Sequence, residues 1–237
     1  MPFELTEEQR DIQRAAREFA EGEFLPEVAL EHDLSQKFPK KIWKKGCQLG
    51  FIGIHFPETV GGQGCGLLEN ILVTEQFCRK DSGLGIALSL SDFATEVVLR
   101  FGDETQRKRF LTPITQAKTL SAGAFTEPEY GYDPEEIGTT ARRDGSYYIL
   151  DGKKSFVING LEADWFVVLC QTDPSAKPKS NGQSLLVVER GANGLNIISS
   201  GEKMGMHMTS MADITFSKTR VPLENRIGPE GGGAPRQ

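Results

Sequence analysis

The spacing of apolar residues changes near residue 120, about halfway along the chain. Before that point apolar side chains recur every three or four residues, which is the period of an amphipathic helix. After it they occur in short runs that alternate with polar residues, which is the period of a strand. The pattern predicts an α+β protein with a helical domain over residues 1–120 and a β domain over residues 121–237. Short strands at regular spacing favour an antiparallel, barrel-like sheet or a sandwich in the β domain.

Helix-terminal signals divide the first domain. Thr6 followed by Gln9 has the form of a capping box, and Pro26 ends or bends the helix that this box starts. Pro39 and Gly50 are typical of the first residue and the end of a second helix. We expect further helices over residues 67–79 and 84–101 and from residue 104 onward.

Turn signals in the second domain consist of Asp or Asn followed by Gly, a strong short-range hairpin signal. They occur at residues 144–145, 151–152, 159–160, 181–182 and 193–194. These turns help to separate the predicted strands, which cover residues 120–125, 146–150, 154–158, 165–170, 184–189, 195–199 and 212–216.

The composition argues against several classes of protein. The 237 residues carry a net charge of −6 with acidic and basic residues interspersed, so we expect no basic face for nucleic acid. The sequence contains no run of about 18 apolar residues that would span a membrane. The N-terminus lacks the charged and apolar regions of a secretion signal. We therefore expect a cytoplasmic protein whose four cysteines, which lack CxxC spacing, are reduced thiols.

Residues 122–133 lie where the two periodicities meet. Within them, Thr126-Glu127-Pro128 forms a rigid step, and Gly131 allows the backbone to approach a ligand closely. A boundary between two kinds of structure is a common place for a ligand site. The glycine-rich residues 57–64 form a second shaped loop, which either approaches a ligand or makes a tight connection between helices.

Short motifs in the same order along nearly the whole chain resemble the acyl-CoA dehydrogenase family. They occupy residues 5–9, 49–53, 57–64, 126–128, 152–160, 203–205 and 221–225 (LTEEQ, LGFIG, PETVGGQG, TEP, GKKSFVING, KMG and VPLEN). The resemblance implies an N-terminal helical domain, a middle β domain and a C-terminal four-helix domain, and the last of these is absent from this sequence.

The resemblance also implies a function. Members of the family use FAD to oxidise an acyl-CoA thioester to the 2-enoyl-CoA and pass the electrons to an electron-transferring flavoprotein. A carboxylate removes the α-proton, and the β-hydrogen leaves as hydride to flavin N5. The family's glutamate base and its homo-oligomer contacts (a tetramer or dimer) belong to the C-terminal domain. We therefore assign no catalytic residue here, Glu127 and Asp133 included, and expect these residues alone to be inactive and to bind flavin weakly or not at all.

The same resemblance implies where the flavin and the substrate lie. Thr126 matches a threonine whose hydroxyl bonds the pyrimidine edge of the flavin. Tyr132 and Asn181 are the implied substrate contacts. The implied flavin contacts are Gly123, Ala124, Phe125, Thr126, Tyr132, Phe156, Val157 and Ile158.

Two of these positions depart from the family pattern. Tyr132 replaces a small serine, and Ile158 stands where a threonine or serine usually offers a hydrogen bond near flavin N5, which isoleucine cannot do. Both departures favour one alternative, a degenerate, non-catalytic family member that binds a partner or an acyl-CoA without flavin chemistry. A further alternative is a flavin oxidase or monooxygenase on the same scaffold. The retained Thr126-Glu127-Pro128 favours dehydrogenation.

Overall fold

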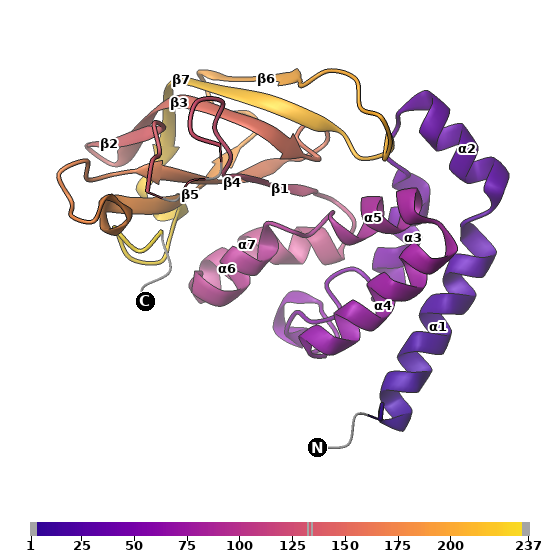
Figure 1. Cartoon of the computed structure of the whole chain (residues 1–237). Coiled ribbons are helices and arrows are strands. Elements are labelled where there is room, and N and C mark those ends of the chain that lie inside the picture. The colour runs from indigo at the N-terminus through magenta and orange to yellow at the C-terminus, as the bar shows by residue number, and fades with distance from the viewer. Residues whose placement is uncertain (1–3, 132, 134, 234–237) are drawn as a thin grey trace. The chain divides into compact units, whose positions relative to one another are not determined.

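The computed structural model describes residues 4–131, 133 and 135–233, with helices in the first part of the chain and strands in the rest (Figure 1). Backbone contacts divide the chain into two compact units, each built from three separate segments. The first unit comprises Met1–Asp92, Leu111–Lys118 and Lys203–Ser210. The second unit comprises Phe93–Phe110, Thr119–Glu202 and Met211–Gln237.

The first unit is mainly helical, and α1 packs along α4 (Figure 1). The capping box predicted at the start of α1 is confirmed. Thr6 Oγ1 accepts a hydrogen bond from the Gln9 N–H at 3.2 Å, and Gln9 Oε1 accepts one from the Thr6 N–H at 3.0 Å. The helices that lie wholly in this unit are α1 (Glu7–Glu23), α2 (Pro26–Ser35), α3 (Lys40–Gln48), α4 (Leu67–Lys80) and α5 (Ser82–Ser89).

Phenylalanine rings meet in the core of the first unit. The ring centroids of Phe19 in α1 and Phe77 in α4 lie 5.4 Å apart, and Phe24 and Phe51 pack against the same two rings. Tilted and edge-on contacts of this kind are favourable because the ring edge is positive and the ring face negative. Phe77 is 1% exposed, so it lies at the centre of this cluster.

One helix prediction needs correction. The single helix expected over residues 84–101 is two helices, α5 and α6 (Thr95–Phe101). At the break, two polar side chains form hydrogen bonds with backbone groups. Ser91 Oγ donates to Leu88 O at 2.6 Å, and the Asp92 carboxylate accepts from the Gly53 N–H at 3.2 Å. The prediction that Pro26 ends or bends the first helix is confirmed, because α1 ends at Glu23. Pro26 itself begins α2, where its missing N–H has no helical partner to lose.

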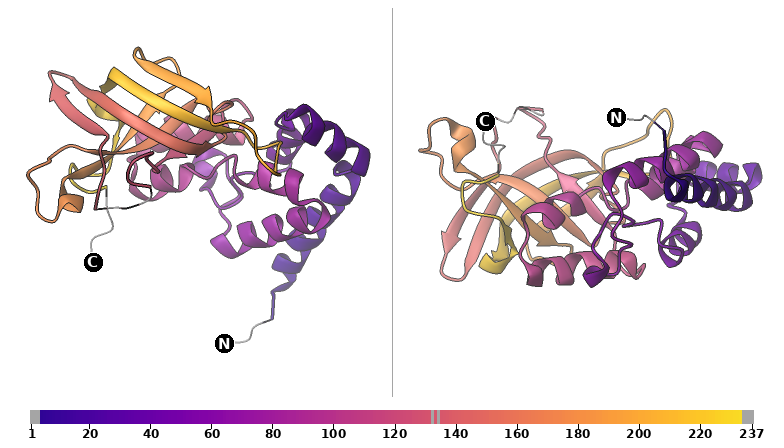
Figure 2. Two further views of the ribbon diagram at one scale, coloured as in Figure 1. Left: turned by 45° about the horizontal axis from the view of Figure 1, so that its top comes forward. Right: turned by 90° about the horizontal axis from the view of Figure 1, so that it is seen from below.

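The second unit contains α6, the first part of α7 (Glu104–Thr115) and an eight-stranded sheet. The strands follow the order β6-β7-β3-β2-β4-β5-β8, and β1 pairs with β4. Figure 2 shows the long strands β3 and β7 side by side. The strands are β1 (Ser121–Ala124), β2 (Thr140–Asp144), β3 (Tyr147–Ile158), β4 (Trp165–Gln171), β5 (Gln183–Glu189), β6 (Leu195–Ser199), β7 (Met211–Pro222) and β8 (Arg226–Ile227).

The sheet is mixed rather than wholly antiparallel. β1 runs parallel to β4, and Thr140 of β2 meets Gln171 of β4 in a parallel bridge. No hairpin joins β1 to β4 in sequence, so no turn fixes their relative direction. Within the described residues no pairing joins β6 to β8, and the sheet is not closed. The predicted α+β class is confirmed, with an open mixed sheet in the second unit.

One turn prediction is wrong. The residues expected to form a hairpin at Asp151-Gly152 lie inside β3, which pairs with β7 along its length. The register of that pairing shifts between Leu150 and Gly152 and again between Lys154 and Val157. Gly152 has φ 149°, and a Cβ there would lie 2.5 Å from Thr139 Oγ1. A glycine bulge therefore replaces the expected turn.

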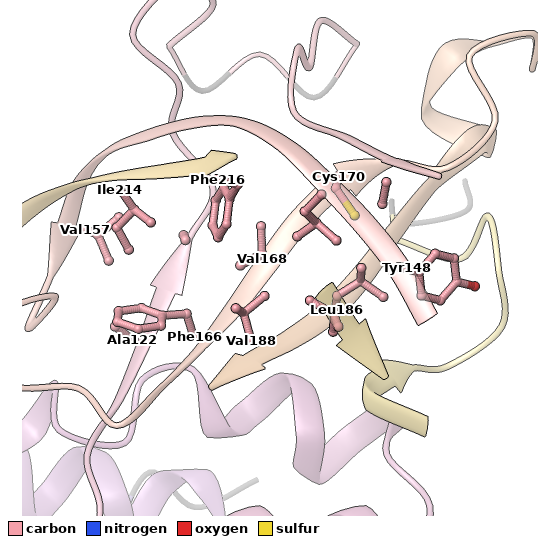
Figure 3. Packing of buried hydrophobic residues seen from close by; sticks show 14 of the residues in the cluster. Ala122, Tyr148, Val157, Phe166, Val168, Cys170, Leu186, Val188, Ile214 and Phe216 are labelled. Atoms are coloured by element: carbon pink, nitrogen blue, oxygen red, sulfur yellow. The ribbon is translucent and has the colours of Figure 1, made fainter. Parts of the chain in front are cut away.

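The sheet curves around an apolar core (Figure 3). Val157 of β3 and Phe216 of β7 point toward Phe166 of β4 and Leu186 of β5 in this view. All four side chains are buried. This core lies beside the end of β1, where the chain leaves the sheet for the segment at the boundary of the two periodicities.

Candidate functional site

The segment that follows β1 is tied to β3. The Thr126 carbonyl accepts a hydrogen bond from the Ser155 N–H at 2.8 Å. Backbone hydrogen bonds of 2.9 Å in both directions between Glu127 and Gly131 close the loop that comes next. The structure therefore brings together two of the predicted segments, the one that ends at Thr126 and the one that begins at Phe156.

A buried ion pair lies against this segment. Lys154 Nζ is 2.8 Å from Glu127 Oε1 and also donates to the Phe125 carbonyl at 3.0 Å. Glu127 Oε1 accepts the Thr139 N–H at 2.9 Å, and Oε2 accepts the Gly138 N–H at 2.6 Å. The Lys154 and Glu127 side chains are 0% and 5% exposed. Because both carboxylate oxygens of Glu127 are occupied inside the protein, this residue is a structural acceptor and not a base.

Burial and hydrogen bonding act in opposite directions on the pKa values of this pair. Burial raises the pKa of Glu127, but the hydrogen bonds from Lys154 and Thr139 outweigh it and bring the pKa below its usual range. Burial lowers the pKa of Lys154, and the bond to Glu127 opposes that shift. Nearby Cys170 is fully buried, which raises the pKa of its thiol to about 12 and makes it unreactive.

Phe156 is both strained and exposed. Its φ of 56° lies in the left-handed region, where a bulky residue is rare, and its side chain is 61% exposed. The Phe156 N–H donates to Asp213 Oδ1 at 3.3 Å, and the same oxygen accepts from Ser200 Oγ at 2.8 Å. Such strain has an energetic cost of about 1–3 kcal/mol and is concentrated at ligand-binding sites. The ring is therefore a candidate binding surface.

Four other residues of the predicted flavin site can contribute only in part. Ala124 and Val157 are 0% and 1% exposed, so their side chains belong to the core and only their backbone atoms can face a ligand. A Cβ at Gly123 would lie 2.5 Å from Phe125 Cε2, so the glycine makes room for the Phe125 ring. Ile158 is half-buried at the end of β3.

Of the two predicted substrate contacts, the structure describes only Asn181. Tyr132 lies outside the described residues. Asn181 is exposed in the short helix η2 (Lys179–Gly182), which connects β4 to β5, and its N–H donates to Pro178 O at 3.1 Å. Asn181 makes no hydrogen bond to Phe125 or Thr126.

A shallow pocket of about 240 Å³ lies beside the loop, lined in part by Pro128, Tyr130 and Gly152. It is smaller than the roughly 300–1,000 Å³ of ordinary ligand pockets, so we assign it no ligand. The described ranges contain no group of three His, Cys, Asp or Glu side chains able to hold a metal ion. In those same ranges, every helix is too short or too polar to cross a membrane.

Lys154 and Asp213 are the residues of this region that the sequence prediction missed. Strand alternation places Lys153 and Lys154 on opposite faces of β3, but the sequence does not say which face is buried. That choice depends on the register with β7, which two bulges shift. The signal that could have indicated a buried lysine was Glu127, a carboxylate to which the sequence analysis gave no role.

The polar groups of Thr126 fit the polar edge of a flavin. Its carbonyl is satisfied by Ser155, whereas its N–H and its hydroxyl form no hydrogen bond with any described residue. Two donors at one residue match the acceptor edge of an isoalloxazine ring. The exposed ring of Phe156, the residue after the Ser155 that binds the Thr126 carbonyl, offers a flat apolar contact. The residues present are therefore compatible with FAD.

Comparisons with known proteins identify the family to which the chain is similar. The family model for the N-terminal domain of acyl-CoA dehydrogenase matches residues 6–118, and the model for its middle domain matches residues 122–219. The short-chain specific acyl-CoA dehydrogenase of Clostridium acetobutylicum is 34% identical over 236 residues, which cover 99% of this chain and 62% of that protein.

Solved structures give the same picture. Butyryl-CoA dehydrogenase from Megasphaera elsdenii is 32% identical with a TM-score of 0.89, over 98% of this chain and 61% of that chain. A chain from the structure of the electron transferring flavoprotein of Acidaminococcus fermentans is 38% identical with a TM-score of 0.91, again over 98% and 61%. The chain thus spans less than two thirds of the length of these relatives.

Proposed function

The chain belongs to the acyl-CoA dehydrogenase family, and we propose that it supplies the flavin-facing surface of an FAD-dependent acyl-CoA dehydrogenase. The proposed reaction is the oxidation of an acyl-CoA thioester to the 2-enoyl-CoA. When bound, FAD supplies the hydride acceptor. Residues 1–120 and 121–237 serve as the helical and the β domain of this enzyme.

The arrangement of Phe156 and Thr126 carries this proposal. Phe156 is held in a strained backbone conformation with its ring exposed. It follows Ser155, which binds the carbonyl of Thr126, and no described residue uses the two donors of Thr126. An exposed ring costs hydration free energy, and unused donors offer no stability to the free chain. Both features are accounted for if a flat ligand with a polar edge covers them.

Each residue of the site has a separate role in the proposal. Thr126 donates to the pyrimidine edge from its N–H and hydroxyl, and Phe156 covers the ring system and excludes water. The wall of the site consists of Gly123, Ala124, Phe125 and Val157. The side chains of Ala124 and Val157 are buried, so these two residues contribute through their backbone atoms. Ile158 cannot hydrogen bond through its side chain, so a backbone group or a water molecule must serve flavin N5. Tyr132 and Asn181 are proposed to contact the acyl-CoA.

The partners of the reaction are also part of the proposal. We propose an electron-transferring flavoprotein as the acceptor of the electrons, a homo-oligomer as the working form, and the cytoplasm as the location. The acyl-CoA dehydrogenases among the relatives support the substrate class, and the flavoprotein structure from Acidaminococcus fermentans supports the choice of acceptor.

The visible spectrum of the purified product of the whole gene tests the proposal. We expect a yellow protein whose flavin bands bleach when an acyl-CoA is added without oxygen. The variant Thr126→Val keeps the shape of the side chain and removes its hydroxyl, so we expect about tenfold weaker FAD binding from one lost hydrogen bond. A colourless protein that takes up no added FAD would overturn the proposal.

Ile158 supports the non-catalytic alternative, because it removes a hydrogen bond near flavin N5. The same experiment separates the two functions. A colourless protein that still binds an acyl-CoA would support a binding role. A yellow protein that no acyl-CoA bleaches anaerobically, and that reduces oxygen with another substrate, would support an oxidase or monooxygenase.

A further inference from the structure

The ammonium group of Lys154 holds the residues on both sides of Thr126. It donates to the carbonyl of Phe125 at 3.0 Å and lies 2.8 Å from the carboxylate of Glu127. Glu127 in turn accepts the N–H groups of Gly138 and Thr139, at the far end of the same loop. One buried cation therefore fixes the start of the loop, and its carboxylate partner fixes the end.

The bond from Lys154 to Phe125 also sets the direction of the next N–H. In a trans peptide the C=O and the N–H point in opposite directions. Because the Phe125 carbonyl points toward Lys154, the Thr126 N–H of the same peptide points away from the ion pair. The Thr126 carbonyl is held separately by the Ser155 N–H at 2.8 Å. The N–H and the hydroxyl of Thr126 are thus the polar groups of this residue left for a ligand.

Stability alone does not account for the ion pair. Replacing a buried ion pair by apolar side chains of similar volume is often neutral or stabilising, because the desolvation of two charges is avoided. Removing only one partner is strongly destabilising, because a charge is left buried and unpaired. What an apolar pair cannot provide is a directed hydrogen bond to the Phe125 carbonyl and to the loop amides.

We propose that Lys154 and Glu127 are positioning residues that fix the peptide between Phe125 and Thr126 in the orientation that presents the Thr126 donors to the flavin. This inference rests on the proposed function. Neither residue touches the flavin, and both act through Thr126. Removing the pair weakens flavin binding even when the fold remains stable.

The experiment compares the product of the whole gene with three variants. Lys154→Met removes one partner, and Lys154→Met with Glu127→Gln removes both charges and keeps an acceptor oxygen for the Thr139 N–H. Lys153→Met is the matched control, because Lys153 is the adjacent lysine, is exposed, and its side chain makes no hydrogen bond with any residue that the structure describes. The measurements are thermal stability, FAD affinity by flavin fluorescence, and hydrogen exchange of the FAD-free protein.

In the FAD-free protein, Lys154→Met is expected to raise amide exchange at Ser155, Gly138 and Thr139 about tenfold or more beyond any rise at Val187 in β5, whose exchange reports the loss of global stability. The double variant regains stability but binds FAD about tenfold or more weakly than the original protein. In Lys153→Met, the amide exchange rates and the FAD affinity stay within about twofold of those of the original protein.

Two results would overturn the inference: unchanged exchange at those three amides in Lys154→Met, or full FAD affinity in a stable double variant. A failure of the original protein to bind FAD overturns the proposed function instead. The exchange pattern of the FAD-free variants then decides by itself whether the pair orders the segment.

Discussion

In the first unit phenylalanine rings from α1 and α4 fill the core, whereas in the second unit a lysine and a glutamate lie buried at the end of β1. Ring contacts gain most of their free energy from the burial of apolar surface, which has no direction, so a cluster such as that around Phe77 specifies how tightly the helices pack. The Lys154–Glu127 pair depends strongly on direction, because each of its hydrogen bonds needs a donor and an acceptor in line. The second unit therefore fixes single peptide groups, which a ligand site needs.

The two tryptophans allow this difference to be measured. Trp43 is buried in the first unit and Trp165 in the second, at 1% and 3% exposure. With Trp165→Phe the fluorescence reports the first unit, and with Trp43→Phe it reports the second. Unfolding can therefore be followed separately for each kind of core.

The largest effect is expected from Phe77→Ala. It removes a ring that is 1% exposed and leaves a cavity, which typically costs about 3–5 kcal/mol for a buried phenylalanine. Chemical denaturation followed by Trp43 should show that loss in the free energy of unfolding of the first unit. Phe101→Ala, at an exposed phenylalanine of the second unit, is the control and should change little. An equal loss in both variants would contradict the comparison.

A smaller effect is expected when Glu127 is titrated. Its pKa in the folded protein lies below the unfolded value of about 4.3, so the carboxylate stabilises the fold above that pH. This stabilisation is lost as the pH falls through the folded pKa. The stability reported by Trp165 should therefore decrease in acid, and less so in Glu127→Gln. Glu129→Gln, at an exposed glutamate of the same loop, should keep the original pH dependence.

The smallest effect is expected at His207 in the first unit, with the opposite pH dependence. Its Nδ1 is 3.0 Å from Asp33 Oδ2 and its Nε2 is 2.7 Å from Lys203 O. Both partners accept, so the ring fits best when both of its nitrogens carry protons.

The hydrogen bond to Asp33 raises the pKa of His207, and the Lys203 carbonyl adds to that effect, while the Lys203 charge opposes it. The stabilisation is therefore complete below about pH 6.5 and is lost as the pH rises through the folded pKa. NMR titration should give His207 a pKa above the usual range. The control is His32→Gln, at a histidine of α2, in which the pKa of His207 should stay raised. A pKa of His207 at or below the usual value would contradict the expectation.

Local signals predicted the start of α1 better than the pairing of the strands. The capping box of Thr6 and Gln9 involves residues three apart, so the sequence alone was sufficient. The turn expected at Asp151-Gly152 failed because pairing with β7 overrides the local preference. β2 was missed because its sequence, TARRD, has one buried residue and mostly exposed side chains. The parallel pairing of β1 with β4 joins residues too far apart for any local pattern.

The site was predicted only as far as its motifs reach. The resemblance located Thr126 and Phe156, and the structure makes their segments neighbours through the Ser155 N–H. The resemblance did not predict that Lys154 rather than Lys153 is buried, because the two residues are chemically identical and only the strand register distinguishes them. The strained φ of Phe156 was likewise not visible, since it arises at a bulge in the pairing of β3 with β7.

The division of each unit into three chain segments has a consequence for synthesis. A chain emerges from the ribosome in order, and the last piece of the first unit is Lys203–Ser210. The helices before residue 93 therefore wait for most of the sheet to be translated before their own unit is complete. A gene cut at residue 120 would separate that short piece from the helices it belongs to, and the released helical fragment would expose the surface this piece covers.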